Sequence, residues 1–267
     1  MLLTAIGLVV GAIGTLIGAG GGFILMPILL IMYPKESPDI LTSISLAVVF
    51  FNASSGSFAY GRMKRIDYKS GLVFSLATIP GAVLGVYTVS MINRSVFNII
   101  FGILLLAVSI YLFIKPDLSK FAHPGSTQKH TRRTITDSDG KTYEYTFNIW
   151  TGIIISLFVG FISSLLGIGG GIIHVPAMVG LLNFPVHVAT ATSHFVLAIM
   201  ALVGTVVHII NGTFVSGMMI TIAVSIGVLI GAQVGARLSN KINGKWIIKA
   251  LAIALGLVGL RMIIFSF

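Results

Sequence analysis

The sequence predicts an all-α, polytopic membrane protein made of two homologous halves. Three observations lead to this fold class: 56% of the 267 residues are apolar and only 9% are charged, the apolar residues form eight long segments, and one glycine-rich motif occurs twice. An ordinary soluble domain is about 25% charged, so this chain has too few charged groups to solvate its own surface. We therefore expect a multi-pass protein of the cell (inner) membrane, with the lipid bilayer as a partner.

The charged residues are mainly basic, with 17 Lys and Arg against 7 Asp and Glu and a formal net charge of +10. In a soluble protein this excess would suggest a nucleic-acid partner. Here the basic residues fall between the apolar segments, so we interpret them as topology signals and expect no nucleic acid. The sequence has no Cys, which excludes disulfides, thiolate metal sites and Cys nucleophiles.

A membrane-spanning helix takes roughly 20 apolar residues, and eight segments of the chain offer about that length or more. They are residues 1–32, 40–60, 70–92, 96–114, 149–182, 186–210, 214–236 and 246–265. We do not expect the first segment to be a cleavable signal peptide, because no basic residue precedes Lys35.

An internal repeat is visible in the first and fifth segments. Residues 16–27 read LIGAGGGFILMP and residues 165–176 read LLGIGGGIIHVP, both with the pattern G-x-G-G-G-x4-P and 149 residues apart. Two more elements match at a spacing of 150: Thr42-Ser43 with Thr192-Ser193, and G-A-x-x-G at 81–85 with the same pattern at 231–235. We predict a first transmembrane repeat over 1–114, a polar connection over 115–148 and a second transmembrane repeat over 149–267.

With these doubled motifs the sequence resembles the TauE/SafE family, the bacterial sulfite and organosulfonate exporter group, over nearly the whole chain. The resemblance implies a secondary transporter, an exporter, whose substrate is a small anion similar to sulfite or an organosulfonate. Another small carboxylate or sulfur anion stays open as the substrate, and so does homo-oligomerisation.

The two glycine-containing segments are too long to be single helices. Residues 1–32 would span about 48 Å at 1.5 Å per residue, against a bilayer core of about 30 Å. Successive glycines cost roughly 1 kcal/mol each inside a helix, and Pro27 and Pro176 favour a fresh helix start or a kink. We expect each segment to form two helical limbs joined by an unwound turn at membrane depth, where protein or a cavity must surround it.

The distribution of Lys and Arg favours a topology. If all eight segments cross the membrane, the basic residues divide 11 to 6 between its two sides; if the two glycine-broken segments are re-entrant hairpins, they divide 14 to 3. The positive-inside rule prefers the second arrangement, with three spanning helices per half, although a broken full crossing stays open. The halves are then inverted repeats, with extracytoplasmic termini and a cytoplasmic 115–148 connection.

The start of each second limb is a candidate anion site, because helix N-termini carry free N–H groups and about half a positive charge. We expect the two helix N-termini to face each other across a pseudo-twofold axis and to bind one oxyanion between them without a buried Arg. The predicted substrate-binding glycines are Gly20, Gly21, Gly22, Gly169, Gly170 and Gly171. The alternative is that these glycines only permit close helix packing, as we expect for Gly81 and Gly85 and for Gly227, Gly231 and Gly235.

Polar side chains within the apolar segments could complete this site. The candidates are Thr42, Ser43, Asn52, Thr192, Ser193, His194, His208 and Gln233. His194, Thr205 and His208 fall within about 60° on one helical face, although the hydroxyls could instead bond their own helix and the histidines be structural. Every Asp and Glu is placed in a connection, so we expect no carboxylate proton relay.

The connection contains a signal for a small hairpin. Residues 132–136 and 141–147 flank Asp139-Gly140, a pair typical of two-residue hairpin turns. We predict a cytoplasmic β-hairpin within a linker.

Other function classes lack their motifs. The chain has no H-E-x-x-H, no G-x-S-x-G and no paired intramembrane carboxylates, so we expect no enzyme, no catalytic residues and no cofactor. The Met residues are scattered and His174, His187, His194 and His208 alone give little basis for a metal site. A non-transporting membrane assembly factor stays open, because glycine-rich packing would also serve it.

Overall fold

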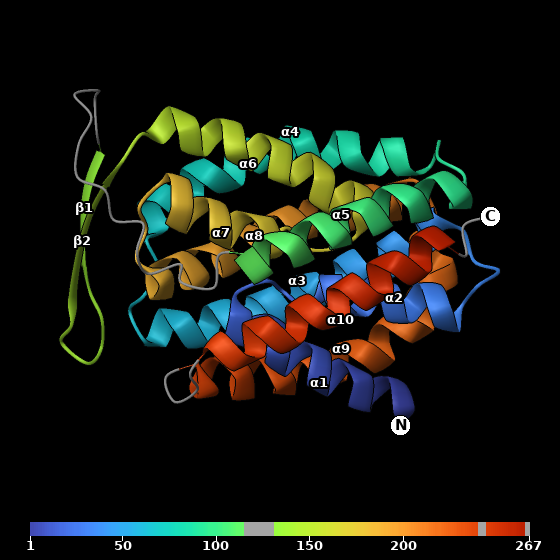
Figure 1. Ribbon diagram of the computed structural model, residues 1–267, viewed down its shortest axis with the longest axis horizontal. Coiled ribbons are helices and arrows are strands. Elements are labelled where there is room, and N and C mark those ends of the chain that lie inside the picture. The colour runs from blue at the N-terminus through green and yellow to red at the C-terminus, as the bar shows by residue number, and fades with distance from the viewer. Residues whose placement is uncertain (115–130, 240–243, 265–267) are drawn as a thin grey trace.

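The computed structural model describes residues 1–114, 131–239 and 244–264, which form a helical bundle with one small hairpin of strands (Figure 1). Residues 115–130 of the predicted connection lie outside the described residues. The elements are α1 (Leu2–Ile17), α2 (Gly22–Met32), α3 (Pro38–Arg62), α4 (Tyr68–Val89), α5 (Arg94–Ile114), β1 (Thr131–Thr136), β2 (Thr142–Phe147), α6 (Ile149–Leu166), α7 (Gly171–Leu181), α8 (Val186–Ile210), α9 (Phe214–Leu238) and α10 (Gly244–Ile264).

Six of the described helices are long and apolar enough to cross a membrane: α3, α4, α5, α6, α8 and α9. The helices α1, α2 and α7 are shorter, and of α10 only Leu255–Ile264 enters this comparison. The protein is thus a polytopic, all-α membrane protein, as predicted. Length alone lets α6, with 18 residues, either cross the membrane or form one limb of a hairpin.

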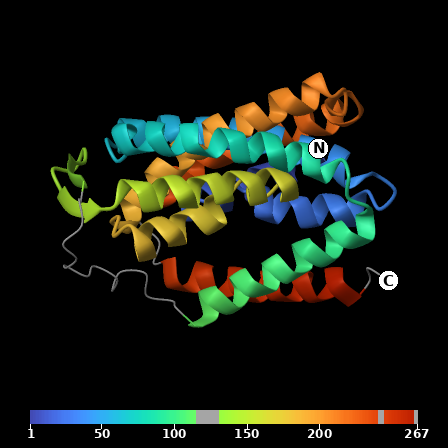
Figure 2. The ribbon, with the colours of Figure 1, turned by 90° about the horizontal axis from the view of Figure 1, so that it is seen from above.

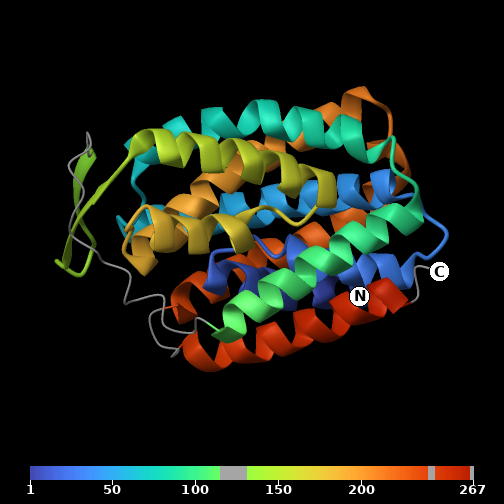
Figure 3. The same cartoon turned by 45° about the horizontal axis from the view of Figure 1, so that its top comes forward.

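Both glycine-rich segments break where the motif predicts. The helix α1 ends at Gly18 and α2 starts after Gly21, while α6 ends at Gly167 and α7 starts after Gly170. In Figures 1 and 3, α1 runs inward from the right and α2 returns to the right, whereas α6 runs inward from the left and α7 returns to the left. The two helical hairpins therefore enter the bundle from opposite ends.

Small residues let the helices of one half pack closely on those of the other. A Cβ added to Gly231 would collide with the carbonyl oxygen of Leu8, and one added to Gly81 would collide with that of Leu157. The first contact joins α9 to α1 and the second joins α4 to α6. Small side chains at such crossings bring the backbones together, so the packing expected of these glycines is confirmed.

The equivalent helices of the two halves pair with each other in antiparallel fashion. On α3 and α8, Gly56 lies against His194 and Gly204 lies against Leu46, so residue numbers rise along one helix as they fall along the other. The helices α5 and α10 also lie antiparallel, as a separate pair at the lower edge of Figure 2. Two equivalent helices that run in opposite directions are what a twofold relation between halves produces.

The contacts correct the predicted alignment between the second apolar segments of the two halves, which form α3 and α8. Gly18 lies against Thr190 and the equivalent Gly167 lies against Thr42, so the structure pairs positions 148 residues apart on α3 and α8. Matching Thr42-Ser43 to Thr192-Ser193 was therefore wrong by two residues. Residues 42–45 read Thr-Ser-Ile-Ser and residues 190–193 read Thr-Ala-Thr-Ser, so both halves contain a Thr-Ser pair, but at different places in the aligned helices.

The strands β1 and β2 form an antiparallel hairpin at the residues that the turn signal predicts. Tyr143, Tyr145 and Phe147 point from one face of β2 into a cluster with Phe74 and Phe184. The hairpin thus packs on the end of the bundle opposite to the start of α1 (Figure 1).

Not every acidic residue lies in a connection. Asp39 belongs to the first turn of α3, one of the helices long enough to cross a membrane. Its placement in a connection was wrong because Pro38, which cannot continue a preceding helix, starts α3 at its first position, with Ser37 as the N-cap.

Candidate functional site

Two glycine turns meet inside the bundle: the first turn (residues 18–22) and the second turn (residues 167–171). In each turn three glycines have a positive φ, between 62° and 84°, which L side chains rarely adopt. A Cβ added to Gly22 would lie 2.7 Å from the carbonyl carbon of Ile168, and one added to Gly171 would collide with the carbonyl oxygen of Gly18. The turns therefore touch backbone to backbone.

Each turn presents the start of a short helix. The N-cap of α2 is Gly21 and that of α7 is Gly170, and neither helix has a side-chain cap or an acidic residue in its first turn. The first N–H groups of a helix have no partner within it, and the helix dipole adds about half a positive charge. Because the turns are in contact, backbone groups of two helix starts can attract one anion.

Four buried side chains form a hydrogen-bonded cluster beside the first turn: Thr15, Asn52, Tyr60 and His194, hereafter the first-turn cluster. Thr15 Oγ1 donates to Asn52 Oδ1 at 3.1 Å and lies 3.3 Å from His194 Nε2. The Tyr60 hydroxyl donates to the Thr15 carbonyl at 2.8 Å. Thr15 Oγ1 therefore joins α1 to Asn52 on α3 and to His194 on α8.

The buried polar atoms of α3 and α8 that have no hydrogen-bond partner among the described residues include Asn52 Nδ2 and Ser193 Oγ. Asn52 Nδ2 lies 3.5 Å from the place that a Cβ on Gly21 would take, beside the N-cap of α2. A buried polar group left unpaired costs roughly 1–3 kcal/mol. An anion at the start of α2 would provide the acceptor that the Asn52 amide lacks.

The second turn is lined by hydroxyl groups. Ser45 donates to the Gly167 carbonyl at 2.5 Å, whereas Ser163 Oγ and Ser164 Oγ are buried and have no partner in the described structure. Ser163 Oγ lies 2.6 Å from the place of a Cβ on Gly170. These hydroxyl groups can rotate to donate to an anion between the turns.

Sequence analysis missed Thr15, Tyr60, Ser163 and Ser164. A signal was available for two of them, because Thr15 and Ser164 directly precede the two copies of the motif, 149 residues apart. Tyr60 offered none, since its contact with Thr15 joins residues 45 positions apart.

Several predicted site residues use their hydroxyl groups elsewhere. Thr42 Oγ1 donates to Pro38 O at 2.9 Å and Ser43 Oγ donates to Ile40 O at 2.7 Å, both within α3. Such bonds satisfy the hydroxyl group locally and leave it without a further proton to donate. Thr42 does contact the second turn, but through its Cα and methyl carbon, each 3.1 Å from the place of a Cβ on Gly167.

The remaining candidates are dispersed. Thr192 Oγ1 accepts a hydrogen bond from the Asp67 N–H at 3.0 Å, and Gln233 donates to Ser55 O at 2.8 Å. His208 lies 14 residues after His194, about 21 Å farther along α8, with partners of its own. The structure thus brings together the glycines, Asn52 and His194, and not the whole predicted set.

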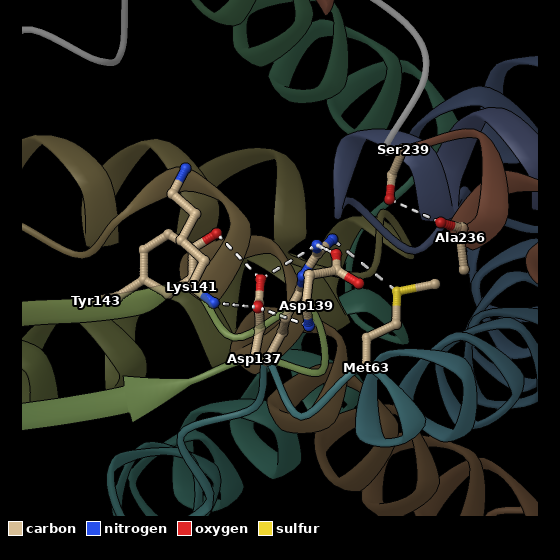
Figure 4. Close-up of polar contacts among 8 residues, drawn as sticks. Met63, Asp137, Asp139, Lys141, Tyr143, Ala236 and Ser239 are labelled. Atoms are coloured by element: carbon tan, nitrogen blue, oxygen red, sulfur yellow. Dashed lines mark hydrogen bonds and ion pairs between the residues drawn. The ribbon is translucent and has the colours of Figure 1, made fainter.

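The hairpin is attached to the bundle by buried polar contacts, shown in part in Figure 4. Asp137 accepts from the backbone N–H groups of Lys141 and Asp139 at 2.9 and 3.0 Å, and its other oxygen lies 3.3 Å from Arg65. Burial raises the pKa of Asp137, but the two backbone hydrogen bonds and the Arg65 guanidinium together lower it below its usual value. The carboxylate therefore stays charged and holds the hairpin to the α3–α4 turn.

A second contact links the hairpin to α8. The Tyr145 hydroxyl donates to Asp67 Oδ2 at 2.8 Å, and the Asp67 N–H donates to Thr192. Burial and the neighbouring Asp67 carboxylate raise the pKa of Tyr145, so the phenol keeps its proton. Hairpin, α4 and α8 are thus joined through one carboxyl residue.

Comparison with known proteins agrees with this architecture. The sequence model of the family described as Sulfite exporter TauE/SafE matches residues 3–262. The chain is 36% identical over 218 residues to the probable membrane transporter protein YunE of Bacillus subtilis, covering 79% of each chain. It is 27% identical over 217 residues to a probable membrane transporter protein of Methanocaldococcus jannaschii, covering 79% of this chain and 73% of the relative.

No solved structure matches the chain. The family match covers both glycine turns, both members of the α3–α8 pair and nearly all of the described helices. The chain therefore belongs to the TauE/SafE family and is a membrane transporter of that type.

Proposed function

We propose that the protein exports a small oxyanion, similar to sulfite or an organosulfonate, which binds where the two glycine turns meet. The observation that carries this proposal is the contact between the two glycine turns, each of which leads into an uncapped helix start, beside the unpartnered amide of Asn52. The site offers backbone N–H groups, hydroxyl groups and one amide, and it has no acidic residue in either helix's first turn. No chemical step is part of the proposal.

The tetrahedral or pyramidal shape of such an anion suits donors from several directions. A sulfonate group presents three oxygens, so it can accept from both helix starts and from Asn52 at once. Ser163 and Ser164 offer further donors from the side of the second turn. A planar carboxylate would engage fewer of these groups, which is why we favour the sulfur oxyanion.

Anion binding requires the turns to separate. Leu197 lies against Gly20, and Val49 lies against both Gly20 and Gly169, so apolar side chains close the sides of the contact. Movement of one half against the other would open the turns to one end of the bundle at a time. This alternating access is common in transporters with inverted repeats.

We infer that the halves are inverted repeats in the membrane, with the β-hairpin in the cytoplasm. The antiparallel pairing of α3 with α8 and the opposite entry of the two helical hairpins support this orientation. The basic residues Arg62, Arg65, Arg132 and Arg133 all lie at the hairpin end. The positive-inside rule places that end in the cytoplasm.

The orientation is tested by labelling single cysteines, because the sequence contains none. Lys141→Cys in the exposed hairpin turn should react with a membrane-impermeant maleimide only after cells are opened. Asn211→Cys, in the exposed turn between α8 and α9, should react in intact cells. Reaction of both from the same side would contradict the inverted arrangement.

Transport is tested with purified protein in proteoliposomes. We expect saturable efflux of sulfite, methanesulfonate or another small sulfonate that exceeds the efflux of acetate. Preference for a small carboxylate would change the proposed substrate class but not the assignment as a transporter. No flux of any anion would favour a membrane assembly factor.

The site itself is tested with Asn52→Leu. A hydrogen bond to a charged group is worth roughly 1.5–3 kcal/mol, so this variant should bind the transported anion about tenfold more weakly or worse. Thr221→Val is the matched control, because the buried Thr221 hydroxyl donates to Gly217 O within its own helix, on α9. Equal affinity in both variants would contradict binding at the first turn.

A further inference from the structure

A buried carboxylate and imidazole meet at the end of the bundle opposite to the hairpin. His208 Nδ1, in the last turn of α8, lies 3.3 Å from Asp39 Oδ1, in the first turn of α3, and 3.0 Å from Thr213 Oγ1. The His208 side chain is fully buried and that of Asp39 is 15% exposed. His208 Nε2 has no hydrogen-bond partner among the described residues.

The surroundings favour a charged pair. The N-terminal end of α3 stabilises a carboxylate, and the C-terminal end of α8 stabilises a protonated imidazole. A single charge at this place would be costly to bury, and the Asp39–His208 contact places two groups of opposite charge type side by side.

Few other charges bear on this pair. In the connection before α3, Lys35 lies exposed and Glu36 is partly buried. The Arg94 guanidinium, on α5, donates to the carbonyl oxygens of Leu30 and Tyr33 at 2.8 and 3.3 Å, and to that of Glu36. From the α8–α9 turn, only the neutral Thr213 faces His208 among the printed contacts of the described residues. Asp39 is thus the carboxylate that lies within ion-pair distance of His208 among the described residues.

We propose that Asp39 and His208 form a proton-binding site, and that the proton bound there is coupled to the anion movement proposed above. A proton from solvent at this end binds the imidazole, and the resulting ion pair ties the start of α3 to the end of α8. Loss of the proton removes that attraction. This inference rests on the proposed transport function, and it gives His208 a role other than anion binding.

The proposed proton site and the first-turn cluster both contain residues of α3 and α8. Asn52 is on α3 and His194 is on α8, so a change in how α3 and α8 pack reaches the first-turn cluster. His208 lies about 21 Å from His194 along α8, which is too far for one anion to touch both. The proton and the anion therefore occupy separate sites on a shared structural element.

A double-mutant cycle tests proton binding without any substrate. Thermal unfolding of the parent, Asp39→Asn, His208→Gln and the double variant is measured between about pH 5 and about pH 9, around the range in which imidazole titrates. A protonated histidine gains stability from its carboxylate below its unfolded pKa and loses it as pH rises. We expect the Tm coupling between the two substitutions to fall with rising pH.

His187→Gln is the matched control, because His187 is an exposed histidine of the same helix. It should show no pH-dependent Tm coupling with Asp39→Asn. Absence of coupling between Asp39 and His208 at every pH, or coupling that is constant with pH, would overturn the proton site.

Coupling to transport is tested in proteoliposomes with methanesulfonate, an anion that stays ionised over this pH range. In the parent and in His187→Gln, a pH gradient should drive methanesulfonate accumulation severalfold and a trapped pH dye should report proton flow. Asp39→Asn and His208→Gln should still exchange labelled for unlabelled methanesulfonate at equal pH but lose gradient-driven accumulation. Accumulation retained in both variants would overturn the coupling.

The two proposals fail in different ways. If the parent exchanges methanesulfonate but ignores the pH gradient, the coupling is wrong and the transport proposal stands. If the parent exchanges neither methanesulfonate nor any other anion, the proposed function is wrong and the coupling falls with it. The stability cycle still decides whether the pair binds a proton.

Discussion

The two glycine turns have the same backbone conformation but differ in the side chains that surround them. Beside the first turn, Gly56 packs on His194 and Thr15; beside the second, the equivalent Gly204 packs on Leu46, with Ser164 nearby. The position of Asn52 corresponds to Met200 in the same register. The glycines are therefore a shared device for chain reversal and close contact, whereas the hydrogen-bonded cluster belongs to the first turn alone. This contrast makes the proposed anion site asymmetric.

The largest effect that we expect is a loss of stability when a glycine is replaced at a helix crossing that both halves share. Gly231→Val and Gly81→Val would each press a branched side chain into a carbonyl oxygen of a neighbouring helix. The loss of stability should exceed the roughly 1–3 kcal/mol typical of overpacking, because a backbone atom cannot move aside. Both variants should lose the monodisperse peak in gel filtration to a similar degree. A severe loss in one half only would break the equivalence of the two crossings.

Valine at the turns themselves is a poor test of transport. Gly21 and Gly170 have φ values of 78° and 62°, so Gly21→Val and Gly170→Val strain the backbone whatever the space available. Their effect on flux would mix folding with binding, and side chains beside the turns are the sharper probes.

The second effect tests the difference between the turns. His194→Leu gives the first turn the side chain that the second turn already has at Leu46, so the bundle should still fold. The substitution also removes the imidazole that lies beside Thr15 Oγ1. Because Thr15 holds Asn52 by a hydrogen bond, we expect the anion to bind about tenfold more weakly, the size of one lost hydrogen bond. Isothermal titration with the transported anion measures this change. The reverse variant, Leu46→His, is the control and should not improve binding.

The β-hairpin is a second difference between the two halves, and its packing on the bundle should depend on pH. The lowered pKa of Asp137 means that its carboxylate stabilises docking above its unfolded pKa of about 4, and that this contribution is lost as pH falls through the lowered value. Hydrogen exchange of the β1 and β2 amides should therefore accelerate in acid. Asp137→Asn should exchange rapidly already at neutral pH, and slow exchange in this variant would show that the Asp137 carboxylate is dispensable for docking.

The smallest effect concerns His174, whose equivalent in the first half is Leu25. His174 Nε2 lies 3.3 Å from Ser156 Oγ, which already donates to Gly152 O. His174→Leu should change the unfolding free energy by no more than about 1 kcal/mol and leave flux unchanged. A large loss of flux would show that the second half also contributes a histidine to transport.

Much of the fold could be predicted from sequence because it depends on local rules. Hydropathy marked the helices, the repeated glycines marked both breaks, and Asp139-Gly140 marked the hairpin turn. Residue spacing could not show that the two turns touch, because that contact depends on packing between halves. The same limit hid the pairing of Asp39 with His208, which joins residues 169 positions apart.

The residues of the candidate site fall into two groups, those that the sequence could predict and those that it could not. Glycines could be predicted, since positive φ and close backbone approach leave few alternatives. Hydroxyl residues of the site could not be predicted. Thr42 and Ser43 donate hydrogen bonds to carbonyl oxygens of their own helix, α3, whereas Ser164 has no partner among the described residues. The sequence alone does not reveal which carbonyl oxygen lies within reach of a hydroxyl group.

The most direct test of the central claim is to locate a bound anion in a crystal structure. Selenate is a suitable probe, because it has the shape of a sulfur oxyanion and its selenium gives an anomalous signal. We predict one peak between the starts of α2 and α7, with an oxygen within hydrogen-bond distance of Asn52 Nδ2. A peak elsewhere in the protein, or none in crystals of protein that binds selenate in solution, would contradict the account.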